Sequence, residues 1–221
     1  MTYEFWDPIF LSVRIALIAS VFVLLMGTLI GRFMAKSSFK GKMLVETVLI
    51  LPLVLPPSVI GFFLIIIFGM NSPIGQVIEN IFNETIIFTW WAGVVAAAVV
   101  AFPLMYQVTK AGFEHVDTDI ENAARVDGAD EGGVFFLVSL PLTIKYIFTG
   151  FVLSFTRALG EFGATLMFAG NIPGKTQTVS TAIYVAIDSG KMDLAWLWVL
   201  SMILISSVML LIVQWMNKKA H

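Results

Sequence analysis

Residues 86–108 read IIFTWWAGVVAAAVVAFPLMYQV, and this stretch contains no charged side chain. A helix needs about 20 predominantly apolar residues to cross the hydrocarbon core of a bilayer. Lipid offers the backbone no hydrogen-bond partners, so a spanning segment is expected to satisfy its own amide groups as a helix. The stretch therefore predicts a transmembrane helix.

Four further segments are long and apolar enough to span: residues 9–30, 47–68, 146–168 and 194–216. The first contains a single charge, Arg14, near its outer end, and we expect this side chain to snorkel to the interface. The sequence therefore predicts an all-α, polytopic membrane helix bundle with five spans. We expect residues 1–221 to form a single transmembrane domain.

Two shorter apolar segments lie between these spans. Residues 75–82 are amphipathic and are expected to lie at the membrane interface. Residues 179–187 are apolar but too short to cross the membrane, and we interpret them as a half-helix or a re-entrant segment. An arrangement with six membrane elements therefore stays open.

The composition agrees with a membrane protein. Hydrophobic residues make up 58% of the chain, charged residues only 13%, and the mean hydropathy is +0.91. A soluble domain averages roughly a quarter charged residues. The net charge of −2 excludes a polybasic nucleic-acid binder. The absence of cysteine excludes disulfides, thiolate catalysis and thiolate-bound metals.

Lysine and arginine predict the orientation, because cytoplasmic loops are enriched in them. Only Lys175 and Lys191 fall in the loops of one side. On this count the N-terminus lies outside and the C-terminus in the cytoplasm. The residues assigned to the cytoplasmic side are Arg32, Lys36, Lys40, Lys42, Lys110, Arg125, Lys145, Lys218 and Lys219.

No catalytic residue and no metal site is predicted. Gly174-Lys175-Thr176 resembles the end of a phosphate-binding P-loop, but Ala169 stands where that loop has its first glycine. The chain has 2 histidines, too few for an intramembrane zinc-binding set. Any ATP hydrolysis must therefore come from another chain.

Prolines interrupt the segment 47–68. Pro52, Pro56 and Pro57 each remove a helical hydrogen bond, and Ser58 follows them. They predict a kink or break near the cytoplasmic half of this span. Broken helices inside a membrane are tolerated where they are buried in protein or line a wet cavity. The four residues are therefore candidates for a translocation path or gate; the alternative is a kink that only fits a crowded bundle.

The segment 146–168 carries Ser154, Arg157, Glu161 and Thr165 at spacings of three and four residues, which predicts one helical face. A lone arginine near mid-span costs about 2.5–3.5 kcal/mol on insertion scales, and a carboxylate one turn away reduces that cost. We interpret Arg157 and Glu161 as a structural pair. The alternative makes the four residues part of an anion path or gate hinge.

Residues 111–145 are too structured for a simple connection. Thr118 and Glu121 predict a capping box for a helix over 119–127, which ends at Gly128. Asp130 is expected to cap a second short helix that ends before Leu140-Pro141. Two short helices meeting at a glycine predict a docking element at about residues 117–141.

Residues 121–129, ENAARVDGA, followed by Leu140-Pro141, resemble the EAA motif of ABC-importer permeases, with Asn122 as one extra residue. In that family the motif inserts into a groove of a cytoplasmic ATPase. The resemblance implies the same docking role for Glu121, Ala123, Ala124, Gly128, Ala129, Leu140 and Pro141.

Two more stretches resemble molybdate permeases: residues 51–61, LPLVLPPSVIG, and residues 157–178, RALGEFGATLMFAGNIPGKTQT. Sulfate permeases share the first part of the second stretch. The resemblance implies a cell-membrane permease subunit that imports molybdate or tungstate. Its implied partners are a cytoplasmic ATPase dimer that holds ATP and Mg²⁺, a second copy of the chain, and an external molybdate-binding protein. This chain itself is expected to bind no cofactor.

Two alternatives stay open. One is an ABC permease for sulfate or another oxyanion. The other is a secondary transporter or channel without an ATPase, in which Glu161 would be a proton site. Five spans do not divide into two equal repeats, and the docking element would then be unexplained.

Overall fold

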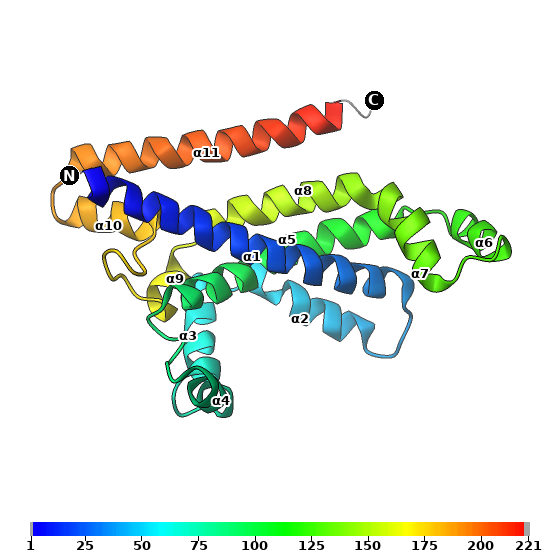
Figure 1. Ribbon diagram of the computed structural model, residues 1–221, viewed down its shortest axis with the longest axis horizontal. Coiled ribbons are helices and arrows are strands. Elements are labelled where there is room, and N and C mark those ends of the chain that lie inside the picture. Colours follow the sequence, from blue (N-terminus) through cyan, green and yellow to red (C-terminus); the bar gives the residue numbers. More distant parts are fainter. Residues whose placement is uncertain (1, 219–221) are drawn as a thin grey trace.

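The computed structural model describes residues 2–218, and helices make up all the regular secondary structure of that range (Figure 1). In chain order the helices are α1 (Thr2–Lys36), α2 (Lys42–Val54), α3 (Pro57–Phe68), α4 (Pro73–Phe82), α5 (Trp90–Glu114), α6 (Thr118–Val126), α7 (Glu131–Gly133), the π-helical η1 (Val134–Ser139), α8 (Leu140–Leu159), α9 (Gly163–Phe168), α10 (Val179–Asp188) and α11 (Met192–Lys218).

Four helices are long and apolar enough to cross a membrane, and the bent pair of α2 and α3 raises this to as many as five spans. The predicted all-α bundle is therefore confirmed. The amphipathic stretch at 75–82 is also helical, as α4, whose first turn is capped by the hydroxyl of Ser72 at 2.8 Å from the amide of Gly75. The apolar stretch at 179–187 forms α10; its place relative to a bilayer stays a prediction.

Helices α1, α5 and α8 lie side by side along the long axis and form the core (Figure 1). Small residues allow α1 and α5 to approach closely. A Cβ on Gly27 would lie 2.5 Å from Cγ of Met105, and one on Gly31 would lie 2.5 Å from Oγ1 of Thr109. The Thr109 hydroxyl also donates to the carbonyl of Gly27 at 3.0 Å. This small-xxx-small contact is typical of packed membrane helices.

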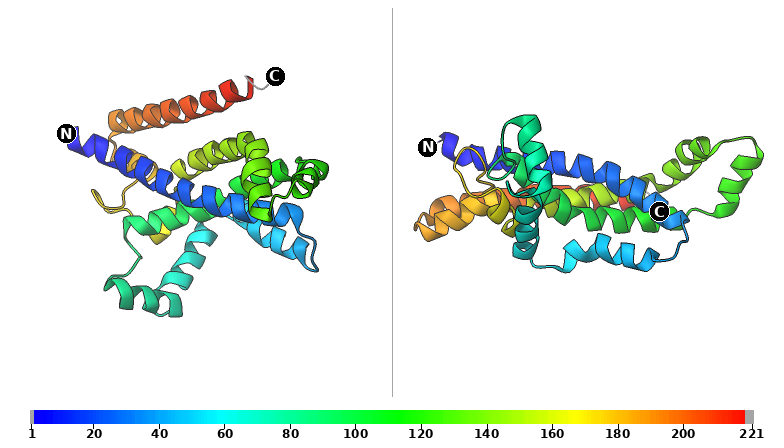
Figure 2. Two further views of the ribbon diagram at one scale, coloured as in Figure 1. Left: turned by 45° about the vertical axis from the view of Figure 1, so that its right-hand side comes forward. Right: turned by 90° about the horizontal axis from the view of Figure 1, so that it is seen from below.

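The proline-rich segment breaks, as predicted. The chain bends by 115° between α2 and α3, so α3 projects away from the long axis of the bundle (Figures 1 and 2). Leu55 is extended, with ψ of 142°, because a residue that precedes proline avoids the helical region. Pro57 begins α3, where a missing amide hydrogen costs nothing. The break at Leu55 and Pro56 lies in the first half of the predicted span 47–68, next to its middle, which is the half where the sequence predicts it.

The predicted span 146–168 is also interrupted, which the sequence did not indicate. Helix α8 ends at Leu159, and α9 begins at Gly163. Glu161 lies between them, and its Oε1 accepts a hydrogen bond from the amide of Ala164 at 2.8 Å. A side chain that caps a new helix competes with continuation of the old one.

The second docking helix does not end before Leu140-Pro141. Helices α7, η1 and α8 follow one another without a break, so that 131–159 form one apolar rod. Pro141 is accommodated in the first turn of α8, directly after the π-helical turn. The predicted stop is therefore wrong, because proline is tolerated in a first helical turn.

The beginning of α1 and the beginning of α11 meet at the end opposite the docking element (Figure 1). Indole Nε1 of Trp198 in α11 donates to the carbonyl of Phe5 at 2.9 Å, and Val179 of α10 is fully buried nearby. Only 11% of the most apolar part of α11 is buried within the chain. Most of this helix therefore faces lipid or another protein.

Candidate functional site

The docking element projects from one end of the bundle (Figures 1 and 2). Asp117, not Thr118, caps α6, through a 2.9 Å hydrogen bond from the amide of Asp119 to its Oδ1. The predicted capping box is therefore wrong. Glu121 does not reach back to the cap, because its carboxylate is held by residues from other parts of the chain.

Glu121 is 2% exposed and lies where α1, α6 and η1 meet. Its Oε1 accepts hydrogen bonds from Nη1 of Arg32 and from the hydroxyl of Ser139, both at 2.7 Å. Its Oε2 is 2.9 Å from Nζ of Lys36. Three donors therefore converge on one buried carboxylate, which is how a buried charge is stabilised.

These donors determine the pKa of Glu121. Burial acts to raise the pKa of the carboxyl, but the hydrogen bonds from Ser139, Lys36 and Arg32 outweigh burial and hold the pKa below its ordinary value. The group is therefore a carboxylate at neutral pH.

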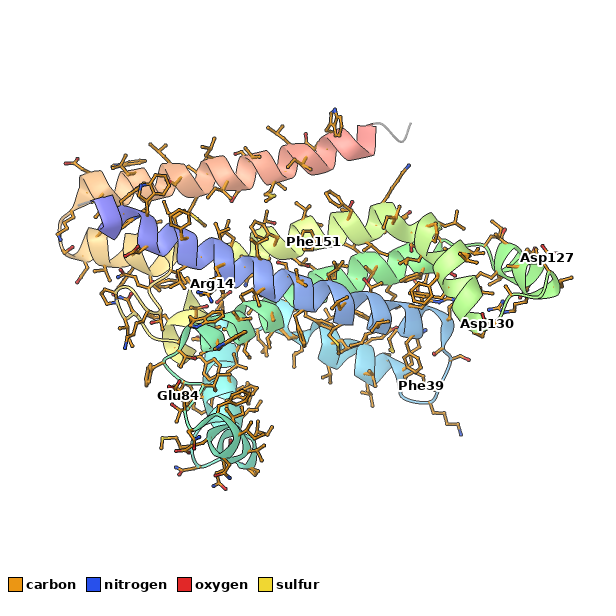
Figure 3. The ribbon with its side chains drawn as sticks, in the orientation of Figure 1. Arg14, Phe39, Glu84, Asp127, Asp130 and Phe151 are labelled. Atoms are coloured by element: carbon orange, nitrogen blue, oxygen red, sulfur yellow. The ribbon has the colours of Figure 1, made fainter. Side chains whose placement is uncertain are left out.

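The turn after α6 forms as predicted. Gly128 has φ of +96°, the amide of Ala129 donates to the carbonyl of Ala124 at 3.0 Å, and the amide of Gly128 donates to that of Arg125 at 3.1 Å. This is a Schellman motif, which requires the left-handed conformation that glycine adopts freely. Oδ1 of Asp130 caps the next helix, 2.7 Å from the amide of Gly133. Asp127 and Asp130 lie at the outer part of the element (Figure 3).

The predicted docking residues have different environments. Ala123, Gly128 and Pro141 are exposed, whereas Glu121 is buried. Ala124, Ala129 and Leu140 are half-buried. Large apolar side chains next to them are also exposed, namely Ile120, Val126, Phe136 and Leu137. The element therefore offers a partly apolar surface at the end of the bundle.

Three of the gate candidates, Pro56, Pro57 and Ser58, lie where the two helix breaks meet. A Cβ on Gly163 would lie 2.9 Å from Cβ of Pro57 and 3.7 Å from the amide of Ser58. A Cβ on Gly61 would lie 3.2 Å from Cα of Ala164. The structure thus places the start of α3 against the start of α9, and Pro56, Pro57 and Ser58 are exposed there.

Arg157 and Glu161 form the predicted pair, with Nη1 to Oε2 at 2.8 Å. The Arg157 side chain is 30% exposed and that of Glu161 only 2%. The prediction that Ser154, Arg157, Glu161 and Thr165 share one helical face is wrong, because α8 ends at Leu159 and Thr165 belongs to α9. Ser154 instead bonds to the carbonyl of Ala101 on α5 at 3.3 Å.

Pro52 lies apart from these residues. It lines an apolar groove of about 610 Å³ between α1, α2 and α5. The guanidinium of Arg14 lies over the ring of Trp90, 4.1 Å from the centre of the ring (Figure 3).

Two further relationships were missed from the sequence. The glycine pair at 27 and 31 has the GxxxG spacing, which was a visible signal. The second is a contact between α2 and α5, where Nζ of Lys110 is 2.7 Å from Oε1 of Glu46. None of the residues of α2 is buried. This ion pair is therefore an important polar contact that holds α2 to α5. No short-range pattern connects two residues so far apart in the chain.

Comparison with known proteins identifies the family. Residues 27–221 match the family described as binding-protein-dependent transport system inner membrane component. The chain is 57% identical over 218 residues to the molybdenum transport permease protein YvgM of Bacillus subtilis, covering 99% of this chain and 95% of the relative. It is 41% identical over 215 residues to the molybdenum transport system permease protein ModB of Escherichia coli, covering 96% and 93%.

More distant proteins share the fold. A sulfate transport system permease protein of Salmonella typhimurium is 34% identical over 78% of this chain and 62% of its own length. A bacterial ABC transporter for alginate superposes with a TM-score of 0.74 at 17% identity, covering 98% of this chain and 78% of that one. The methionine transporter MetNI in an inward-facing conformation superposes with a TM-score of 0.73 at 12% identity, covering 100% of this chain and 98% of that one.

Residues 27–221 include both helix breaks and the whole docking element. The family and the apolar helices make the chain a multi-pass membrane protein and a transport subunit, not an enzyme. The chain therefore belongs to the family of binding-protein-dependent transport system inner membrane components.

Proposed function

We propose that this chain is the membrane-spanning subunit of an ATP-driven importer for molybdate, with tungstate as a second cargo of the same chemistry. The observation that carries this proposal is the similarity to molybdenum permeases, 57% and 41% identical over nearly the full chain. The sulfate permease is 34% identical over 78% of the chain, which favours molybdate over sulfate.

The energy comes from a partner in this proposal. A cytoplasmic ATPase dimer binds ATP and Mg²⁺ and docks on the exposed surface of α6, the turn at Gly128 and η1. The exposed apolar residues Ile120, Val126 and Leu137 support such a contact, because a partner would cover them. This chain binds no cofactor of its own.

The docking end faces the cytoplasm in this proposal. Arg32 and Lys36 end α1, Lys42 begins α2, and Lys110 lies in the last turns of α5. The α6 helix with Arg125 lies at the same end (Figure 1). This segregation supports the positive-inside orientation, with the N-terminus outside. Lys219, counted on the same side, lies outside the described residues.

A second copy of the chain completes the pathway. One chain carries a single docking element, whereas two ATP sites form between two ATPase subunits, so two copies related by a two-fold axis are needed. The exposed residues Pro56, Pro57 and Ser58 at the break of α2 and α3 then line the path or its gate. An external molybdate-binding protein delivers the oxyanion from the opposite side.

The ion pair between Arg157 and Glu161 supports a structural role for Arg157 rather than a role in binding the substrate. One guanidinium nitrogen is held by the buried carboxylate of Glu161, which also caps α9. Both oxygens of Glu161 are engaged, which disfavours the secondary-transport alternative with Glu161 as a proton site. Uptake of labelled molybdate into vesicles, with and without the ATPase, distinguishes the proposals.

A further inference from the structure

The docking helix α6 does not follow α1 directly, because four helices separate the two in the chain. Within residues 2–218, the hydrogen bonds and ion pairs that join α6 to α1 all involve Glu121. Arg32 and Lys36 lie one turn apart in the last turns of α1, and both reach the same carboxylate. Glu121 is thus the polar link between the docking element and the first helix of the core.

The same carboxylate also joins α6 to the rod that continues into α8. The hydroxyl of Ser139, which is fully buried, donates to Oε1 of Glu121 at 2.7 Å. Ser139 is the last residue of the π-helical turn η1. Such turns occur mostly as single turns and are frequent at functional sites.

The side chain of Glu121 is not available to a docked partner. It is 2% exposed, whereas its neighbours Asn122 and Ala123 are exposed. The two faces of α6 therefore differ in function. The outer face can contact a partner, and Glu121 on the inner face holds the helix to its own chain.

We infer that Glu121 is a positioning residue that fastens the docking helix α6 to the cytoplasmic ends of α1 and of the η1–α8 rod, so that movement of the docked ATPase moves both together. This inference rests on the proposed function. Hydrogen bonds to a charged group are roughly twice as strong as neutral ones, and α6 cannot swing away from α1 without breaking them. Helix α1 is in turn packed on α5 through Gly27 and Gly31, so the movement reaches the core.

The test compares Glu121→Gln with Arg32→Gln combined with Lys36→Gln, which removes the partners on α1 and leaves Glu121 unchanged. Glu114→Gln is the matched control, because Glu114 is a carboxylate at the same end that is ion-paired with Lys110 at 3.5 Å but exposed. The chain contains no cysteine, so cysteines introduced at Phe33 of α1 and Asp119 of α6 can be spin-labelled selectively. All variants are measured in the assembled complex with the ATPase.

Three quantities are measured: ATPase retained on the purified permease, molybdate taken up per ATP hydrolysed, and the distribution of distances between the two spin labels. For Glu121→Gln we expect normal ATPase retention, a broadened distance distribution, and uptake per ATP lowered between about 5- and 150-fold, the usual range of a coupling free energy. The double variant Arg32→Gln with Lys36→Gln shows the same broadened distribution and the same lowered uptake per ATP, with normal ATPase retention. Glu114→Gln leaves all three unchanged.

Two outcomes overturn the inference. If Glu121→Gln loses the ATPase while Arg32→Gln with Lys36→Gln retains it, Glu121 contacts the ATPase directly. If Glu121→Gln keeps a narrow distribution and normal uptake per ATP, Glu121 positions nothing. Failure of the proposed function is separate, because it would show as no ATP-dependent molybdate uptake by the unaltered protein while its label distances remain narrow.

Discussion

Arg157 donates a 2.8 Å hydrogen bond to Glu161 across the end of a helix, because α8 stops at Leu159 between the two residues. The same carboxylate caps α9 through the amide of Ala164. The pair therefore fixes the break at which α9 meets the start of α3. This geometry gives the two residues unequal importance for the fold.

We expect Glu161→Ala to lower the yield of assembled protein more than Arg157→Met, since only the first removes both the ion pair and the cap. Breaking a fully buried pair costs about 3–5 kcal/mol, and the cost here is lower because the Arg157 side chain is 30% exposed. The double variant Arg157→Met with Glu161→Gln keeps an acceptor for the amide of Ala164 and recovers much of the yield. Size-exclusion chromatography in detergent measures this order.

Uptake by the double variant decides between the structural and anion-path interpretations. Transport by a well-assembled double variant would show that Arg157 is no essential anion ligand. Good assembly without molybdate uptake, while the ATPase still turns over, would contradict the structural interpretation.

Gly128→Val is expected to weaken ATPase association without preventing membrane insertion. At φ of +96° a side chain is strained although no atom lies within 4 Å of the added Cβ, and the left-handed conformation costs roughly 1–2 kcal/mol per residue. Gly128→Asn should be milder. Gly190→Val is the control, because Gly190 has φ of +72° and equally open surroundings but lies at the other end. Co-purification of the ATPase is the measurement; equal loss in both valine variants would refute a specific docking role.

Gly31→Ala is expected to lower the thermal stability of the purified protein. The added Cβ would lie 2.5 Å from Oγ1 of Thr109 and 3.1 Å from the amide of Lys110, so α1 and α5 must separate. Overpacking of this kind typically costs about 1–3 kcal/mol. Leu29→Ala serves as the control on the same helix, because Leu29 is 58% exposed. Thermal unfolding followed by tryptophan fluorescence measures both; a larger loss for Leu29→Ala would contradict the packing account.

Protection of α6 from hydrogen exchange should depend on pH through Glu121. The pKa of the Glu121 carboxyl is lower in the folded chain than in the unfolded chain. The ionised carboxylate therefore stabilises the folded state fully above the unfolded pKa of about 4.3. This stabilisation is lost as the pH falls through the folded pKa. Protection of residues 118–126, corrected for intrinsic exchange rates, should be level from neutral pH to about pH 5 and fall below that. In Glu121→Gln the protection of residues 118–126 from hydrogen exchange should be lower, and it should not change over this pH range. Identical profiles in the two proteins would contradict the assignment.

The apolar spans, the proline break and the turn at Gly128 could be predicted because each depends on a local pattern. The break after Leu159 could not, since Gly160 and Gly163 are equally compatible with close packing of one continuous helix. The capping box failed for a similar reason. Asp117 and Thr118 are adjacent candidates for the cap, and the distant donors Arg32 and Lys36 determine where the Glu121 side chain goes.

Docking residues were predicted from a motif, but their environments depend on tertiary structure. The motif does not distinguish buried Glu121 from exposed Ala123. The tether between Glu46 and Lys110 joins two helices that no sequence spacing relates. By contrast, the spacing of Gly27 and Gly31 was a local signal for the contact of α1 with α5.

The central claim is most directly tested by uptake of radiolabelled molybdate into membrane vesicles that contain this chain, its ATPase and the external binding protein. The account predicts ATP-dependent accumulation that disappears when either partner is omitted and that tungstate inhibits more strongly than sulfate. Accumulation that needs no ATPase and follows an ion gradient, or ATP-dependent uptake of sulfate in preference to molybdate, would contradict it.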